Sequence, residues 1–403
     1  MVAEAVLANQ FNLRALPDAF FEDPYPTYAA LRRNEPIRRM PDGSLFLSRH
    51  SDLMAVYRDA ATFSSDKRQE FQPKYGDTPL YAHHTTSLVF NDAPFHLRVR
   101  KILMGALNPA AVSSYEGAID ALCERLLDQI EEQGGGDAVR DYAAAIPVEV
   151  ISNLLDVPVE EREPLRGWSL AILGALEPVL TAEAEMHGNA AVSAFLDYLG
   201  DLVARRRKNP GDPQRDILTR LIFCEGEPLA ERELLHNCIF LLNAGHETTT
   251  NLIANGIDLF ARFPDERRRL LKDPSLAPKA VEEVLRFESP NQLGNRRTLT
   301  KVRFGEKTVE AGTLITLGIG AANRDDSEFA EASAFRIDRE RNRHLAFASG
   351  PHQCAGLGLA RIEGRIALTR FVTRFPDYGI GGGSRRARRA RFRGFDTLRI
   401  VAR

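Results

Sequence analysis

Cys354 lies in a segment whose composition suits a metal ligand or a nucleophile. Glycines and a proline surround the sulfur in Phe347-Ala348-Ser349-Gly350-Pro351-His352-Gln353-Cys354-Ala355-Gly356, which indicates a turn. The residues that follow, 357–371, carry apolar side chains at mostly helical spacing. A thiol at the start of a helix faces free backbone N–H groups and the positive end of the helix dipole. We therefore expect this environment to keep Cys354 deprotonated.

A lone cysteine can also have quite different roles. An arbitrary cysteine is most often a small buried hydrophobic residue, and Cys123, Cys224 and Cys238 fit that description in apolar helical segments. A zinc site requires four ligands, and His352-x-Cys354 has no second pair at a comparable spacing. A thiol protease would require an activating histidine elsewhere, which one sequence does not exclude.

A second polar group interrupts the longest helical pattern of the chain, at 231–261. At 1.5 Å per residue this helix would be about 46 Å long, enough to cross the molecule. In its middle, Gly245 and three consecutive threonines are poor helix formers. Thr248 can donate a hydrogen bond to the carbonyl of Ala244, four residues earlier, and we expect this bond to open a groove in the hydrogen-bond ladder.

A zinc helix is the first alternative for this polar group. His246-Glu247 matches the start of a His-Glu-x-x-His motif, but Thr250 stands at the position of the second histidine. The zinc motif therefore fails, and His246 is expected to be a packing residue or an indirect neighbour of the site.

The two segments together resemble the cytochrome P-450 family of haem-thiolate monooxygenases. Phe-x-x-Gly-x-His-x-Cys-x-Gly is similar to the family's haem-binding loop, and Ala244-Gly245-His246-Glu247-Thr248 matches its Ala-Gly-x-(Glu/Asp)-Thr signature. The resemblance implies that haem b is the cofactor and Cys354 the axial ligand of its iron. It also implies that Glu247 relays protons and that Thr248 contacts dioxygen. Cofactor contacts implied in these segments are Ala244, Phe347, His352 and Gly356.

One position of the loop departs from the family pattern. Many members have Gly directly after the Phe, where this chain has Ala348. If the loop requires a positive φ there, the Cβ of Ala348 would be strained.

Further site residues follow from the resemblance. His96 and Arg100 share a helix face, which in isolation suits a solvated basic surface. By resemblance they bind a haem propionate, with Arg297 (or its neighbour Arg296) and His352 as further contacts. Glu283 and Arg286 are three apart and are expected to form a structural clamp with Arg339. Candidates for the substrate pocket are Phe240, Asn243 and Leu293.

Asn243 fits two roles. It is either a polar helix residue whose hydrogen bonds are satisfied within the protein or a residue that faces the substrate cavity. In the second case it indicates a substrate with a hydrogen-bonding group on a mainly apolar or aromatic body.

The elements that position these residues are mostly helical. The fold class expected from the resemblance is mainly α, the cytochrome P-450 fold, with small β-sheets and haem between the long helix and the cysteine loop, in one domain over 1–403. Residues 64–90 are expected to be irregular and to cap the substrate pocket. Further expected elements are helices at 27–34, 53–59, 112–132, 144–157, 168–182 and 188–208, a helix begun by Asp92-Ala93-Pro94 with Asp92 as N-cap, a hairpin at 37–48, short strands at 302–304 and 314–317, and a partly exposed terminal hairpin that contains the basic run 385–393.

Composition narrows the function classes. With 403 residues, 44% hydrophobic content and a formal net charge of −2, the chain has a large core and no basic surface for nucleic acid or anionic membranes. Residues 1–21 lack a signal-peptide pattern, and no apolar run is long enough to span a membrane. Four irregularly spaced cysteines indicate the cytoplasm. We expect a monomer.

The expected activity is insertion of one oxygen atom from dioxygen into a small, largely apolar or aromatic substrate, by hydroxylation or O-dealkylation. This chain contains no flavin or iron–sulfur segment, so by resemblance a ferredoxin with its NAD(P)H-dependent reductase supplies electrons. Exposed members of Arg336, Arg339, Arg341, Arg343 and Arg361 would form a docking surface for that ferredoxin.

Two alternative activities differ from this one. The first is a peroxide-dependent peroxygenase, which the Glu247-Thr248 pair argues against. The second is a non-catalytic haem protein that binds a ligand, in which a proton relay would serve no purpose.

Overall fold

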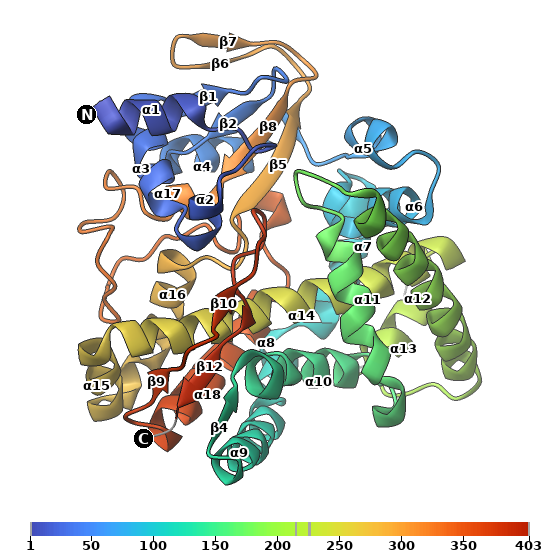
Figure 1. Cartoon of the computed structure of the whole chain (residues 1–403). Coiled ribbons are helices and arrows are strands. Elements are labelled where there is room, and N and C mark those ends of the chain that lie inside the picture. Colours follow the sequence, from blue (N-terminus) through green and yellow to red (C-terminus); the bar gives the residue numbers. More distant parts are fainter. Residues whose placement is uncertain (1, 214–215, 225–226, 402–403) are drawn as a thin grey trace.

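The longest helix, α14 (Glu231–Arg262), crosses the computed structural model of the chain from one side to the other (Figure 1). The structure describes residues 2–213, 216–224 and 227–401. Nearly every residue from Thr249 to Phe260 is buried, as expected for a helix covered by neighbours on all sides. The predicted helix at 231–261 is therefore present, and it forms the axis of the fold.

Helices surround α14. Its direct neighbours are α6 (Pro79–Thr86), α10 (Ala145–Leu154), α11 (Glu163–Gly174), α12 (Ala182–Lys208), α16 (Ala277–Phe287) and α18 (Leu357–Arg374). Helix α18 packs against both α14 and α9 (Glu116–Glu132). The cysteine loop directly precedes α18, so this packing fixes the loop relative to the long helix. The remaining helices include α1 (Val2–Gln10), α2 (Asp18–Glu22), α3 (Tyr25–Asn34), α4 (His50–Arg58), α5 (Arg68–Tyr75), α7 (Phe95–Ala106), α8 (Pro109–Ser113), α13 (Ile217–Ile222), α15 (Pro264–Lys272) and α17 (Ile319–Ala322).

A five-stranded sheet lies beside the N-terminal helices (Figure 1). Its order is β1 (Ile37–Arg39), β2 (Leu45–Leu47), β8 (Leu314–Gly318), β5 (Leu293–Thr298) and β3 (Phe63–Ser64). The predicted hairpin at 37–48 is the β1–β2 pair, and β2 continues in parallel register with β8. Strand β5 reaches from the sheet toward α14 and carries candidate site residues from Leu293 onward.

The last strand, β12 (Arg399–Val401), is the central strand of a three-stranded sheet between β4 (Gly135–Asp137) and β9 (Gly379–Ile380). The terminal hairpin pairs β10 (Arg385–Arg386) with β11 (Phe395–Thr397), and a separate hairpin pairs β6 (Val302–Phe304) with β7 (Lys307–Val309). The basic run is partly exposed, as predicted, with Arg385 and Arg388 at the surface. Arg386 pairs with Asp258 at 2.9 Å, and Arg393 is buried.

Residues 64–90 are more ordered than predicted. They form the helices α5 and α6 and a 3₁₀ turn at Leu88–Phe90. Thr78 caps α6 by accepting from the backbone N–H of Tyr81, and Pro79 occupies its first turn. Both helices have eight residues, too few for a clear periodic pattern, and Pro73 inside α5 adds a breaker signal. These features concealed the helices in the sequence.

Two further predicted elements differ in detail. The helix expected at 112–132 is divided into α8 and α9, with a break around Ser114 and Tyr115. Asp92 does not cap α7 with its side chain, because its carboxylate accepts hydrogen bonds from Ser64 Oγ and the backbone N–H of Ser65. Asp92 therefore fastens β3 to the start of α7.

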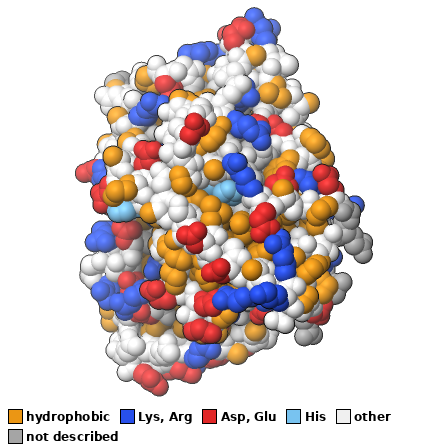
Figure 2. All heavy atoms as spheres, turned by 90° about the vertical axis from the view of Figure 1, so that its right-hand side faces the viewer, with side chains coloured by type: hydrophobic (Ala, Val, Ile, Leu, Met, Phe, Trp, Pro, Cys, Tyr) orange, Lys and Arg blue, Asp and Glu red, His pale blue; other side chains and the backbone are white. Residues whose placement is uncertain are grey.

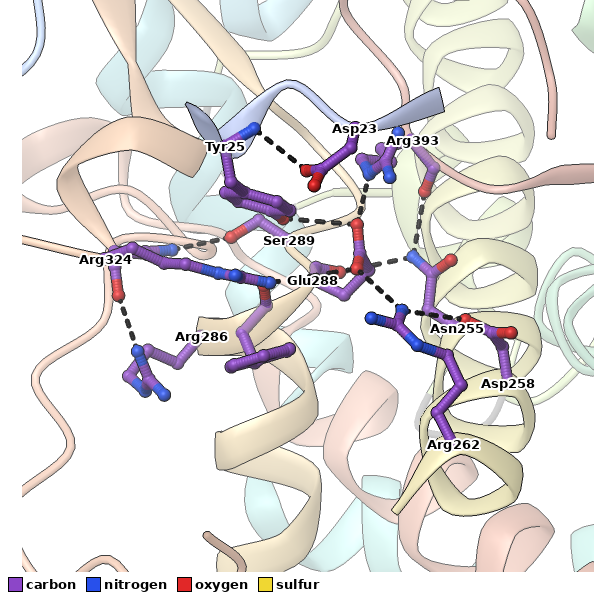
Figure 3. A network of polar contacts seen from close by, with 12 residues as sticks. Asp23, Tyr25, Asn255, Asp258, Arg262, Arg286, Glu288, Ser289, Arg324 and Arg393 are labelled. Carbon is purple, nitrogen blue, oxygen red and sulfur yellow. Dashed lines mark hydrogen bonds and ion pairs between the residues drawn. The ribbon is translucent and has the colours of Figure 1, made fainter. Parts of the chain in front are cut away.

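A buried polar network joins three distant parts of the chain around Glu288, which follows α16 (Figure 3). Tyr25 of α3 donates to the Glu288 carboxylate at 3.2 Å, and Arg393 donates to the same group. Asn255 of α14 donates to the backbone carbonyls of Glu288 and Arg393, at 3.2 and 2.9 Å. Burial raises the pKa of Glu288, but the positive charges of Arg393, Arg386 and Arg324 outweigh it and lower the pKa to about 2.

Charges of both signs are mixed on the face shown in Figure 2, which carries helices from the right-hand side of Figure 1. Lys, Arg, Asp and Glu side chains alternate there with hydrophobic ones, and neither sign dominates the face. Among the described residues, no helix combines the length and apolar character that crossing a membrane requires.

Candidate active site

A cavity of about 360 Å³ lies between α14 and the cysteine loop. Its wall includes both chemical groups that the sequence singled out, Cys354 on one side and Thr248 on α14. The wall also includes the predicted residues His96, Arg100, Phe240, Asn243, Ala244, Leu293, Phe347, His352 and Gly356. The volume is within the range of small-molecule and cofactor sites.

The loop before α18 holds Cys354 toward this cavity. The backbone N–H of Cys354 donates to the carbonyl of Phe347 at 2.9 Å, which closes the turn. Ala348 has φ of +54°, so the strain expected for a non-glycine residue at this position is present. Cys123 and Cys238 are buried, whereas the Cys354 side chain is open to the cavity. Cys354 is therefore the cysteine available to bind an iron atom in the cavity.

The prediction that the helix start keeps Cys354 ionised is wrong for the chain by itself. Protein surrounds the open cavity, and this burial raises the pKa of the thiol. The backbone N–H of Gly356 and the charges of Arg100 and Arg361 oppose the shift without reversing it. A bound metal ion would deprotonate a thiol that coordinates it.

Arg361 supports the loop from outside the cavity. Its guanidinium lies 5.1 Å from the centre of the Phe347 ring and forms two hydrogen bonds to Glu282, at 2.7 and 2.9 Å. His344 contacts the same carboxylate at 3.1 Å. Burial raises the pKa of Glu282, but these hydrogen bonds outweigh it and lower the pKa to about 2. Arg361, expected at a partner surface, therefore has a structural role here.

Opposite Cys354, α14 presents Ala244 and Thr248. Thr248 Oγ1 donates to the carbonyl of Ala244 at 2.9 Å, as predicted. Helix α14 nevertheless continues through this point. The expected opening of its hydrogen-bond ladder is therefore not seen as a break in the helix. A carbonyl oxygen has two lone pairs, so that of Ala244 can accept a hydrogen bond from the hydroxyl and still accept the backbone hydrogen bond of the helix. The result is a hydroxyl held at the wall of the cavity.

Glu247 turns away from the cavity wall. Its carboxylate accepts from Arg389 at 3.0 Å and from Asn251 at 3.2 Å, and its residue is 7% exposed. Arg389 comes from the C-terminal hairpin, so a segment far along the chain holds the predicted proton carrier. His246 is buried, and burial lowers its pKa to about 3, which agrees with a packing role.

Basic and imidazole groups form one edge of the cavity. The rings of His96 and His352 stack with centres 3.9 Å apart, and burial lowers the pKa of both, that of His352 to about 3. Arg100 and Arg296 line the same edge, and neither has a carboxylate partner among the described residues. Partly buried guanidinium groups without anions fit the propionates of haem.

Arg296, not Arg297, lines the cavity. Successive residues of a strand point to opposite faces, and β5 turns Arg296 toward the cavity beside the Tyr57 ring, at 5.5 Å. The sequence prediction that favoured Arg297 is therefore replaced by its stated alternative. The register of a short strand decided the choice, and the sequence alone does not fix that register.

The expected clamp is present as a buried cluster. Glu283 accepts two hydrogen bonds from Arg286, both at 2.8 Å, and one from Arg339 at 3.1 Å. Arg286 also donates to the carbonyls of Asn323, Ala332 and Ala334. The side chains of Glu283 and Arg286 are completely buried. The cluster ties α16 to the long segment that leads to the cysteine loop.

Asn243 faces the cavity, with its residue 3% exposed. Its Oδ1 atom has no hydrogen-bond partner among the described residues. The alternative in which the protein satisfies this side chain internally does not hold for that atom. Phe240 and Leu293 supply apolar surface to the same wall.

Glu363 is a cavity residue that sequence reasoning missed. It lies on α18, is 3% exposed, and its Oε2 atom has no partner among the described residues. Burial raises its pKa to about 8, so the carboxyl is mostly protonated at neutral pH. The available signal was its spacing: Glu363 lies four residues after Leu359 and three before Ile366, on the apolar face of this helix.

Comparisons with known proteins agree with this geometry. A family model described as cytochrome P450 matches residues 170–376. A vitamin D(3) 25-hydroxylase from Pseudonocardia autotrophica is 36% identical over 369 residues, or 90% of this chain and 89% of that protein. A biotin biosynthesis cytochrome P450 from Bacillus subtilis is 32% identical over 365 residues, covering 90% and 91%.

Solved structures share the fold. The crystal structure of P450BioI in complex with an acyl carrier protein ligated to hexadec-9Z-enoic acid has a TM-score of 0.91 at 30% identity, covering 96% of this chain and all of that one. CYP109E1 from Bacillus megaterium in complex with testosterone has a TM-score of 0.87 at 29% identity, with the same coverage.

Proposed function

The chain belongs to the cytochrome P450 family, and from this premise we propose that it inserts one oxygen atom from dioxygen into a largely apolar or aromatic organic substrate, by hydroxylation or O-dealkylation. The observation that carries the proposal is the placement of the Thr248 hydroxyl and the Cys354 thiol in one cavity. The family binds haem, and the residues of this cavity fit it: Cys354 as iron ligand, and Arg100, Arg296, His96 and His352 at the propionates.

Bound haem supplies activation of dioxygen with two electrons, and the protein supplies position, protons and exclusion of water. Cys354 provides a negatively charged sulfur ligand once it is ionised. The Phe347–Arg361–Glu282 contacts hold its loop, and the Glu283–Arg286–Arg339 cluster holds the segment before it.

Two side chains are placed for proton delivery. The Thr248 hydroxyl stands at the cavity wall, where it would hold and pass on a proton when it leaves the Ala244 carbonyl. Glu247 reaches solvent through Arg389, whose side chain is 23% exposed, and release of that ion pair frees its carboxylate to carry a proton. The ion pair with Arg389 therefore holds the Glu247 side chain in place until the proton is carried.

A ferredoxin with its NAD(P)H-dependent reductase is the proposed electron source. Of the five arginines near the cysteine segment, Arg339 is withdrawn because its side chain is 9% exposed, and Arg336 and Arg361 pair with carboxylates. Arg341 and Arg343 remain exposed near that segment, and the Arg341 guanidinium contacts the Glu328 carboxylate only at 3.9 Å. A charge reversal at both should slow electron transfer most at low ionic strength, and equal effects at all salt concentrations would count against this surface.

Four free cysteines support a reducing cytoplasmic location.

A three-way activity assay tests the proposal. Purified protein is first screened for compounds that convert low-spin to high-spin haem, and these compounds are incubated with ferredoxin, reductase and NADH, with peroxide alone, or with neither. We expect oxygenated product with the electron chain. Product from peroxide alone would favour a peroxygenase, and protein that takes up no haem or lacks a thiolate-type Soret band with carbon monoxide would overturn the assignment.

A further inference from the structure

The cavity has a second polar end, formed by two adjacent histidines of α6. His83 and His84 both line the cavity and are 2% and 1% exposed. Their rings lie 5.1 Å apart, and the ring of His236 on α14 lies 5.6 Å from that of His83. His236 precedes Ala244 by eight residues and Thr248 by twelve, so the histidine cluster lies toward the start of α14, about 12–18 Å along the helix from these two residues.

His84 is held in a fixed position but has an unused hydrogen-bonding atom. The rings of Phe71, Tyr75 and Phe90 surround it, each centre 5.5 Å from the imidazole centre. Its Nε2 atom is buried and has no partner among the described residues. A buried polar atom without a partner costs about 1–3 kcal/mol, and a ligand that bonds to it recovers part of that cost.

The histidine end is uncharged. Burial lowers the pKa of His84 to about 3, assisted by the charges of Lys74, Arg391 and His236, so the imidazole is neutral at physiological pH. Lys74, whose pKa burial lowers to about 8, and Arg391 both already have acceptors. Lys74 donates to the carbonyls of Ala175 and Glu177, and Arg391 donates to Leu176, Leu293 and Asn295. A substrate carboxylate would therefore be buried without a free cation as partner.

We propose that His84 is a substrate-binding residue that accepts a neutral molecule with a hydroxyl group at the end remote from the carbon that is oxidised. A hydroxyl fits because it pairs with either tautomer of a neutral imidazole, as donor or as acceptor. The apolar wall between the two ends, with Phe240 and Leu241 on α14, contacts the body of the molecule. This inference rests on the proposed function and assigns the orientation of substrate in the same cavity.

The test compares three ten-carbon probes, decane, 1-decanol and decanoic acid, by calorimetric titration of the haem-loaded protein. We expect wild type to prefer the alcohol over the alkane and the acid. In His84→Phe, which keeps an aromatic ring but no nitrogen, affinity for the alcohol should fall about tenfold while affinity for decane is unchanged. In His84→Gln, which places an amide at similar reach, the preference for the alcohol should persist.

His236→Phe is the matched control, because His236 belongs to the same histidine cluster and does not line the cavity. This variant should bind all three probes as wild type does. Equal affinity of wild type for alcohol and alkane, a preference for the acid, or an unchanged preference for the alcohol in His84→Phe would each overturn the inference. Haem content and the carbon-monoxide Soret band of the same samples report on the proposed function independently.

Discussion

The hydroxyl of Thr248 is the smallest unit on which the proposed activity depends. We predict that Thr248→Ala retains substrate binding but oxidises NADH with at least tenfold less product per electron pair, because the proton donor at the cavity wall is lost. The measurement is the ratio of product to NADH consumed.

Thr250→Ala is the control for this variant. Thr250 Oγ1 also donates to a carbonyl four residues earlier, that of His246 at 3.0 Å, but it does not line the cavity. The two variants therefore remove the same local bond on different faces of α14. A similar loss of coupling in both would show that helix geometry, not the hydroxyl in the cavity, is responsible.

The carboxyl of Glu363 makes stability depend on pH in a direction that can be stated. The folded protein holds this proton up to pH about 8, whereas an unfolded glutamate releases it near 4.5. Between these values the folded state binds more protons, so stability falls as pH rises, by about 5 kcal/mol at most. We predict that Glu363→Gln removes this slope. The measurement is the free energy of unfolding in urea at pH 5 and pH 8.

An exposed carboxyl provides the comparison for Glu363. Glu160→Gln, in the turn Val159–Glu161, should leave the difference between pH 5 and pH 8 unchanged because solvent surrounds that side chain. A slope in Glu363→Gln equal to that of wild type would contradict the assignment of the buried proton to this residue.

At the scale of elements, the cysteine loop contains strain at one position. Ala348 has φ of +54°, where a Cβ costs about 1–2 kcal/mol. Because glycine is more flexible in the unfolded chain, we predict a net gain of only about 1 kcal/mol for Ala348→Gly. Urea unfolding of the haem-loaded protein measures it. Ala346→Gly, in the same loop without a positive φ, should instead be destabilised by a similar amount.

The elements also show where sequence reasoning succeeds. The axis α14 and the helix after Cys354 were predictable because long amphipathic or buried helices leave a strong periodic signal. Helices α5 and α6 were missed because each is too short to show a period. Residues 64–90 do contribute to the cavity wall, as expected, but without the helices the sequence did not show that His84 is one of the residues that face it.

The site residues also divide into those that a local sequence pattern predicted and those that depend on tertiary packing. Cys354, Thr248 and the Glu283–Arg286 pair belong to local patterns, so their spacing predicted their contacts. Arg296 and Glu363 depend on which face of a strand or helix meets the cavity, and tertiary packing decides that. Arg389 approaches Glu247 from 142 residues away, a distance across which no sequence pattern acts.

At the scale of the whole molecule, the Glu288 network joins α3, α14 and the C-terminal segment. The pKa of Glu288 is lowered, so its ionised form stabilises the folded protein. This contribution to the free energy of unfolding, about 3 kcal/mol, is present above about pH 4.5 and is lost as pH falls toward 2. We predict that Glu288→Gln lowers stability at pH 7 by about 3–5 kcal/mol and flattens the decline below pH 4.5. Acid titration followed by circular dichroism measures both.

Tyr25→Phe separates the charge of this network from its packing. It removes one hydrogen bond, from an uncharged donor to the Glu288 carboxylate at 3.2 Å, and should cost about 1–2 kcal/mol while the acid decline persists. An acid decline that disappears in Tyr25→Phe, or persists in Glu288→Gln, would assign the acid sensitivity to different carboxylates.

The span of the cavity wall has a consequence for how the cofactor is enclosed. The wall is drawn from residues as early as Tyr57 and as late as Phe392. Segments so far apart in the chain meet only in the folded protein, so a partly folded polypeptide offers the porphyrin no complete enclosure.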